Sequence, residues 1–417
     1  MSQAQVFRLT AFAAAAFLSA SVLAQTQPQS PPKAQAWINV ATFSGMGMPM
    51  GAGANPMAAL GGLFGGGSAA KNTFGQTRSM AAGRWVDATL LVRANPALAD
   101  ANWAVPESFM RPALKLLAPE TRERVPDESD DKPIERDVEK PRGKLLMYWG
   151  CGAAVRAGQP KVLDMASATA ADLGRFFVSR SSTSRGAHAS AGRPLWPNTQ
   201  DARMVPAGAS LAGEHRFTGA GVPDNFRFQI PAAQDLMPAL TLSQKANAGA
   251  TELGWSAAAS ARAYFVAAMG AGAGAGAGGR EEMVLWTSSE LPDTGFGLAD
   301  YQTNASIDRW LGERVLLNPS TTQCTVPAGV FTGGGAMLRL VGYGSELNLA
   351  YPPRPSDVRQ RWDPEWAVKL RVKSITSGML GMEDMAGIQG GRPGVEAKPE
   401  EAAKPKPLDL LRGILGR

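Results

Sequence analysis

The side chains with the greatest chemical potential in this chain are its two cysteines and its two histidines. Cys151 lies between two glycines at the end of an apolar run, KLLMYW, which predicts a strand. A catalytic thiolate needs a nearby histidine or a helix N-terminus, and the chain offers only His188 and His215. Three interpretations stay open: a disulfide between Cys151 and Cys324, two buried free thiols, or, least favoured, a nucleophile.

Glu214 and His215 are the acid–base pair that the sequence places side by side. On a strand, adjacent residues face opposite sides of the sheet, so these two side chains cannot readily pair. A histidine in this position more often bonds to a backbone carbonyl. The chain lacks a G-x-S-x-G elbow, and its Gly-Ala run at 270–279 satisfies G-x-G-x-x-G only through its own alternation. We therefore expect a protein that is not an enzyme, with no catalytic, cofactor-binding or metal-binding residue.

Two weaker patterns are typical of ligand sites. Met46, Met48 and Met50 resemble the methionine clusters that bind copper, since thioethers favour Cu(I). No histidine lies near them, so a loose apolar loop is the favoured interpretation. Trp362 and Trp366 are flanked by charged residues and are candidates for an exposed ring platform, such as glycan-binding proteins use.

Composition narrows the class of protein. The 417 residues are 44% hydrophobic and 19% charged, with 47 Gly and 30 Pro, a balance that favours strands and loops over long helices. The formal net charge of +6 is dispersed along the chain. Nucleic-acid binding needs a clustered basic stripe with aromatic residues, so we expect no nucleic-acid partner.

The first 24 residues predict an export signal. Arg8 supplies the positive charge, residues 9–20 the apolar stretch, and residues 22–24 a small-residue cleavage site. No other segment is long and apolar enough to predict a membrane span. We expect cleavage after Ala24 and a mature protein without a transmembrane segment in the periplasm, or secreted beyond it.

The remaining chain predicts two mostly β domains and a tail. The first covers residues 25–235 and contains loops at 44–68, rich in Gly and Met, and at 119–144, dense in charge and Pro. The second covers residues 236–378. Residues 379–417 predict a low-complexity linker that ends in a short amphipathic helix.

Alternation of side chains supports the strand assignments. Phe226, Phe228 and Ile230 share one face of a predicted strand. In residues 366–375, apolar side chains alternate with Lys369, Arg371 and Lys373, which predicts a half-buried antiparallel strand with an exposed charged face. The fold class we expect is mostly β, with two β-sandwich-like domains and long Gly/Pro-rich and charged loops.

Residues 252–375 resemble a fibronectin type III or related immunoglobulin-like sandwich. The resemblance depends on Trp255, on the Tyr264-x-Val266 pattern across a short loop, and on residues 324–346. It implies two packed antiparallel sheets. The segments KLLMYWGCG, LWPN, SLAGEHRF and MVLWTSSE also resemble uncharacterised secreted proteins of Gram-negative bacteria, a likeness that supplies no activity.

These observations predict an exported, non-enzymatic binding or envelope-organising protein. Its partner is expected to be an envelope protein or a glycan. The alternative is a glycan-binding or hydrolytic periplasmic protein. The sequence leaves the oligomeric state open.

Overall fold

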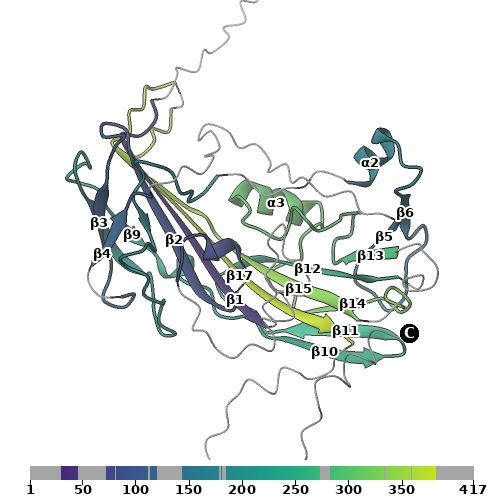
Figure 1. The fold of residues 1–417 in the computed structure, drawn as a ribbon. Coiled ribbons are helices and arrows are strands. Elements are labelled where there is room, and N and C mark those ends of the chain that lie inside the picture. Colours follow the sequence, from purple (N-terminus) through teal and green to yellow (C-terminus); the bar gives the residue numbers. More distant parts are fainter. Residues whose placement is uncertain are drawn as a thin grey trace, which may run out of the picture.

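The computed structural model describes residues 30–45, 72–79, 81–110, 113–119, 143–177, 180, 185–272, 282–332, 335–357 and 359–381. The prediction of a mostly β fold is confirmed: one large mixed sheet and one small sheet hold most of the regular structure (Figure 1). The predicted signal segment, most of loops 44–68 and 119–144, and residues 382–417 lie outside the described residues.

The elements are as follows. The large sheet contains β1 (Ala34–Gly45), β2 (Gly83–Val92), β3 (Asp100–Ala104), β4 (Ala113–Leu117), β5 (Lys144–Trp149), β6 (Lys161–Asp164), β7 (Leu195–Trp196), β8 (Gly213–Thr218), β9 (Arg227–Ile230), β12 (Ala261–Ala271), β13 (Glu282–Thr287), β15 (Ala336–Gly344), β16 (Leu347–Tyr351) and β17 (Trp366–Leu380). The small sheet contains β10 (Leu242–Asn247), β11 (Ala250–Trp255) and β14 (Gln323–Val326). The helical elements are α2 (Ala170–Phe176), α3 (Asn304–Gly312) and the 3₁₀ turns η1 (Gln76–Arg78) and η2 (Ala232–Gln234).

The large sheet runs in the order β6-β5-β13-β12-β15-β17-β1-β2-β7-β4-β3-β8-β9, with β16 paired to β17. Two neighbouring pairs, β1 with β17 and β5 with β13, are parallel, and the other pairs are antiparallel. The block β13-β12-β15-β17 from the second predicted domain therefore lies between strands of the first predicted domain, and one sheet crosses the predicted boundary. Figure 1 shows the two ends of the sheet far apart, with β3, β4 and β9 on the left and β5, β6 and α2 on the right.

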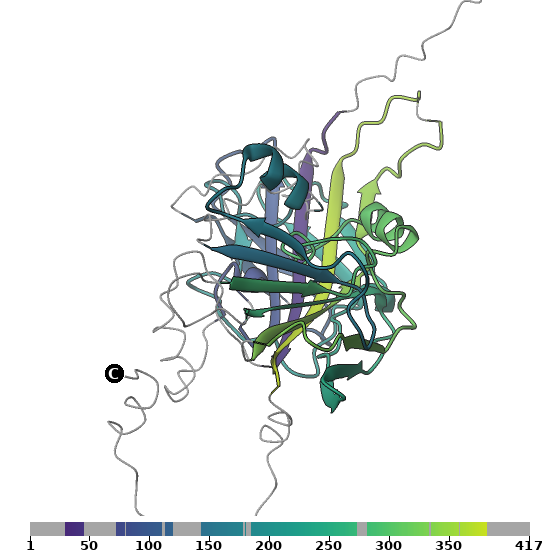
Figure 2. The same cartoon turned by 90° about the vertical axis from the view of Figure 1, so that its right-hand side faces the viewer.

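Burial on both faces explains the central strands. Ile38 and Val40 of β1 belong to the main core, which extends over β2, β17, the strands near β9 and the small sheet. On the opposite face, Ala41 and Phe43 join a second core with Ile307 and Trp310 of α3. A strand buried on both sides has a nearly continuous apolar sequence, as AWINVATF has. Turning the view by 90° places β5 and β6 in front of β1 and β17 (Figure 2).

The exposed charged face predicted for β17 is wrong at Arg371 and Lys373, whereas Lys369 is half-buried. Arg371 and Lys373 are each only 2% exposed, because the segment before α3 and the loop that contains Gly186 cover them. The strand pairs in parallel with β1 on one side and antiparallel with β15 and β16 on the other. Alternation with charged residues therefore marks a covered face here, and not a solvated one.

Candidate binding groove at the sheet edge

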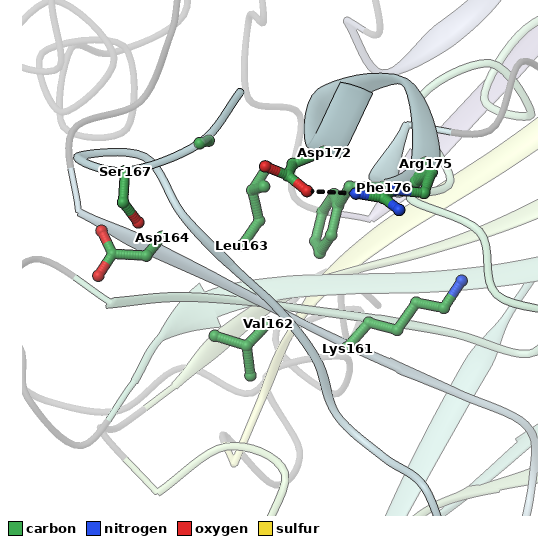
Figure 3. A pocket seen from close by; sticks show the side chains of 9 residues that line it. Lys161, Val162, Leu163, Asp164, Ser167, Asp172, Arg175 and Phe176 are labelled. Atoms are coloured by element: carbon green, nitrogen blue, oxygen red, sulfur yellow. Dashed lines mark hydrogen bonds and ion pairs between the residues drawn. The ribbon is translucent and has the colours of Figure 1, made fainter. Parts of the chain in front are cut away.

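The groove lies at one end of the large sheet, between the terminal strand β6 and helix α2. It is an open cavity of about 510 Å³ (Figure 3). Its lining consists of Lys161, Val162, Leu163, Asp164, Ser167, Ala168, Asp172, Arg175 and Phe176. A concave site with an apolar base and a few polar groups is the usual form of a binding site.

A small satellite core fixes β6 and α2 against each other. Leu163 is 4% exposed and packs with Leu145 and Met147 of β5 and with Phe176 of α2. The helix begins with a capping box: the Thr169 hydroxyl oxygen accepts a bond from the Asp172 N–H, and the Asp172 carboxylate accepts a bond from the Thr169 N–H. The apolar packing and the capped helix N-terminus together position α2 beside β6.

Val162 is the exposed apolar side chain of the groove. It is 56% exposed, and it points away from α2, whereas Leu163 points toward it (Figure 3). Val162 is a β-branched residue on a strand that has no partner strand on its outer side among the described residues. Its exposure therefore coincides with a free sheet edge.

Both signs of charge line the groove. The Asp172 carboxylate accepts hydrogen bonds from the Thr169 side chain and backbone and from Arg175, and these bonds lower the pKa of Asp172 to about 2. Asp164 accepts a bond from the Ala166 backbone N–H at 3.0 Å. Among the described residues, no carboxylate pairs with the Lys161 ammonium, so that cation remains available at the strand's first residue.

Cys151 and Cys324 are joined by a disulfide, with their Cα atoms 5.2 Å apart. Cys151 follows β5, and Cys324 lies in β14, so the bridge connects the groove's end of the large sheet to the small sheet. Two backbone hydrogen bonds lie beside the bridge: the Gly152 N–H donates to the Thr325 carbonyl at 2.9 Å, and the Ala328 N–H donates to the Ala153 carbonyl at 3.0 Å. The sequence left a disulfide, two free thiols and a nucleophile open for Cys151, and the structure contains the disulfide.

Gly150 explains one of the glycines that flank Cys151. Its φ of +91° lies in the left-handed region, and a Cβ at this position would meet the Arg156 guanidinium. Arg156 forms a two-pronged ion pair with Glu290 and donates to the Cys151 carbonyl. The glycine therefore makes room for a side chain that fixes the turn after β5.

His215 is a core residue. It is 1% exposed, it accepts a bond from Trp103 Nε1 at 3.1 Å, and it bonds to the Leu211 carbonyl at 2.7 Å. Burial lowers the pKa of His215 to about 4, so the ring is neutral at pH 7. Glu214 points to the exposed face of β8, as the alternation predicted. His188 is also buried, and its Nε2 lies 3.5 Å from the Arg78 guanidinium.

The covered face of β17 holds a cluster of buried polar groups. The Arg371 Nε and Nη2 atoms donate to Asn39 Oδ1 at 3.1 and 3.0 Å, and the Arg371 guanidinium lies 4.5 Å from the centre of the Tyr301 ring. Gly186 packs directly onto the same guanidinium, so the covering loop fills the space above it. These charges hold loops onto the sheet.

Of the two candidate ligand sites predicted from the sequence, the structure describes only the tryptophan pair. Trp366 is 6% exposed, because its ring stacks between Phe226 and Tyr351, so its predicted exposure is wrong. Trp362 is half-buried under Arg354. Met46, Met48 and Met50 lie outside the described residues.

The groove was not found by sequence reasoning, although two signals were present. Residues 169–176, TAADLGRF, contain a T-x-x-D capping pattern before a short apolar face. Residues 161–164, KVLD, carry a β-branched valine next to a leucine, but the sequence does not say that a strand here ends the sheet. An exposed valine was therefore not distinguished from a buried one.

Comparison with known proteins gives no match: no family model, curated protein or solved structure is significantly similar to this chain. Within the described part of the chain, no helix combines the length and apolar character needed to cross a membrane.

Proposed function

We propose that this protein is exported to the periplasm or beyond it, and that it serves there as a non-enzymatic protein that binds a partner protein of the envelope. The export-type leader of residues 1–24 supports this location. The binding site is the groove between β6 and α2. The single observation that carries the proposal is Val162, which is 56% exposed on the terminal strand of the sheet beside an open cavity.

The edge position and the charges of β6 suit the binding of a partner and disfavour pairing with the sheet edge of a second copy. Proteins protect exposed sheet edges with short strands and charged side chains. The strand β6 is four residues long, and Lys161 and Asp164 lie at its two ends. The exposed Val162 side chain, on a strand with a charge at each end, gives a partner an apolar contact. The two charges disfavour edge-to-edge pairing with other sheets.

Site-specific photo-crosslinking tests the proposal. A crosslinking residue in place of Val162 is compared with one in place of Met204, an apolar side chain that is 44% exposed elsewhere on the surface. In envelope extracts we expect a defined protein adduct from position 162 that is absent from position 204. Equal adducts from both positions would contradict the groove as the binding site.

Glycan arrays and hydrolase panels test the alternative. Under the proposal, the wild-type protein binds no glycan through the groove and turns over no substrate. Glycan binding that is lost in Val162→Arg but kept in Met204→Arg would replace the protein partner with a glycan. Reproducible turnover by the purified full chain would overturn the non-enzymatic assignment.

A further inference from the structure

We propose that the groove takes an extended peptide segment of its partner, which adds to the large sheet as a new strand beside β6. The segment carries an apolar residue next to Val162 and an acidic residue next to Lys161. This inference rests on the proposed function, because it names the kind of segment that the same groove binds.

The hydrogen-bond pattern of β6 leaves backbone groups free for a new strand. Met165 N–H donates to the Gly143 carbonyl at 2.9 Å, and the pairing with β5 continues through Leu163–Leu145 and Lys161–Met147. In an antiparallel pair, alternate residues turn their N–H and C=O groups toward the neighbouring strand. The backbone groups of Val162 and Asp164 therefore point outward. The Asp164 carbonyl already accepts a bond from the Ser167 N–H at 3.2 Å. The Val162 N–H and C=O and the Asp164 N–H have no bond to another described backbone group, so an extended peptide can bond to these three groups.

Pro160 limits the length of this edge. It precedes β6 and has no backbone N–H to donate, so the ladder cannot continue beyond Lys161 in that direction. Two outward-facing residues supply only a few hydrogen bonds, and each contributes little net affinity because it replaces a bond to water. Side-chain contacts in the groove must therefore supply much of the affinity and the specificity.

The two sides of β6 select different side chains. Val162 extends away from α2 and offers an apolar contact on that side (Figure 3). Leu163 extends toward α2, and Lys161 shares its face of the strand, since side chains two residues apart point the same way. Asp172 is already bonded to Thr169 and Arg175, whereas Lys161 is not paired with any described carboxylate. A bound strand therefore alternates between an apolar residue beside Val162 and an acidic residue on the α2 side.

A display library of short random peptides tests this inference. The library is selected on the full-length wild-type protein and counter-selected on Val162→Arg. We expect peptides with apolar residues at every second position and an acidic residue between them. Peptides with a helical spacing of three and four, or no enrichment over the counter-selection, would overturn the inference.

A charge reversal adds an independent readout. Cross-strand charge pairs contribute up to about 1 kcal/mol, so Lys161→Glu should weaken a selected acidic peptide about fivefold and favour its Lys-substituted version. Lys245→Glu is the matched control, because Lys245 is an exposed lysine on a strand of the small sheet. Equal effects of the two substitutions would contradict an acidic contact at Lys161.

Disulfide trapping reports the geometry of the bound segment. The two native cysteines are bonded to each other, so Val162→Cys introduces the single free thiol of the chain. Selected peptides with cysteine at successive positions should be trapped at alternate positions only. Trapping at every peptide position would overturn strand addition but would leave the groove as a binding site. If no peptide is trapped and position 162 also gives no photo-adduct, the proposed function itself is overturned.

Discussion

The Lys373 ammonium lies 2.7 Å from the Asp300 carboxylate, with side chains that are 3% and 14% exposed. Lys373 also lies 4.2 Å from the centre of the Tyr301 ring, which faces Arg371 at 4.5 Å. The segment before α3 is thus held on β17 by one ion pair and two cation–ring contacts. Burial alone disfavours the carboxylate, but Lys373 and Arg371 outweigh it and keep the pKa of Asp300 below its ordinary value.

Asp300→Ala should destabilise the fold. It leaves the Lys373 ammonium buried without its partner, and removing one member of a buried pair costs about 3 kcal/mol or more. Urea denaturation followed by tryptophan fluorescence measures the loss. The double variant Asp300→Ala/Lys373→Met should lose less than Asp300→Ala alone, because no unpaired charge remains. A double variant as unstable as the sum of the two single variants would contradict this account.

His215 should make the fold less stable in acid. Its folded pKa of about 4 is below the ordinary 6.5, so the unfolded chain binds the proton first. The contribution of the neutral ring is present above pH 6.5 and is lost as the pH falls through 4, a total of about 3 kcal/mol. Denaturation of wild-type and His215→Gln proteins over this range measures the effect. An equal loss of stability in the wild-type and His215→Gln proteins between pH 6.5 and 4 would contradict a role for the His215 ring.

Asp87 should give the opposite pH dependence: its contribution to the stability of the fold decreases as the pH rises. Burial raises its pKa to about 6, although it accepts bonds from Thr77 and from the Gly75 backbone. The protonated form is therefore favoured in the fold, and this contribution, present below the ordinary 3.8, is lost as the pH rises through 6. Carbon NMR of the Asp87 carboxyl should titrate near pH 6. A midpoint below 4 would show that the bonds outweigh burial.

Reduction of the Cys151–Cys324 bridge should lower stability. The bridge closes a separation of 173 residues, for which chain-entropy models give about 5 kcal/mol as an upper estimate. Denaturation with and without reductant measures the loss in the wild-type protein. The double variant Cys151→Ser/Cys324→Ser is the control, and it should be unaffected by reductant. Equal stability of oxidised and reduced wild-type protein would contradict a structural bridge.

Local sequence patterns predicted the strands well. The apolar run KLLMYW is β5, and the alternating residues Phe226, Phe228 and Ile230 lie at β9, because bulky and β-branched side chains favour a pleated, buried surface. The alternation of Glu214 and His215 was also predicted, since it depends only on the two-residue period of a strand. These features need no knowledge of which strands are neighbours.

The features that depend on long-range pairing could not be predicted. Arg371 and Lys373 look like a solvated face until the segment at Asp300 folds over them. Val162 reads as an ordinary core valine until β6 is known to end the sheet. Both features depend on the order of the strands in the sheet. The periodicity of the sequence predicts which residues form a strand, but it does not predict which strands are neighbours.

Amide hydrogen exchange across β6 tests the edge-binding account most directly. With a selected peptide bound, exchange should slow at Val162 and Asp164, whose N–H groups point outward, and change little at Leu163, which already faces β5. Slowing confined to residues outside β6, or no slowing at all while the peptide is bound, would contradict a partner strand at this edge.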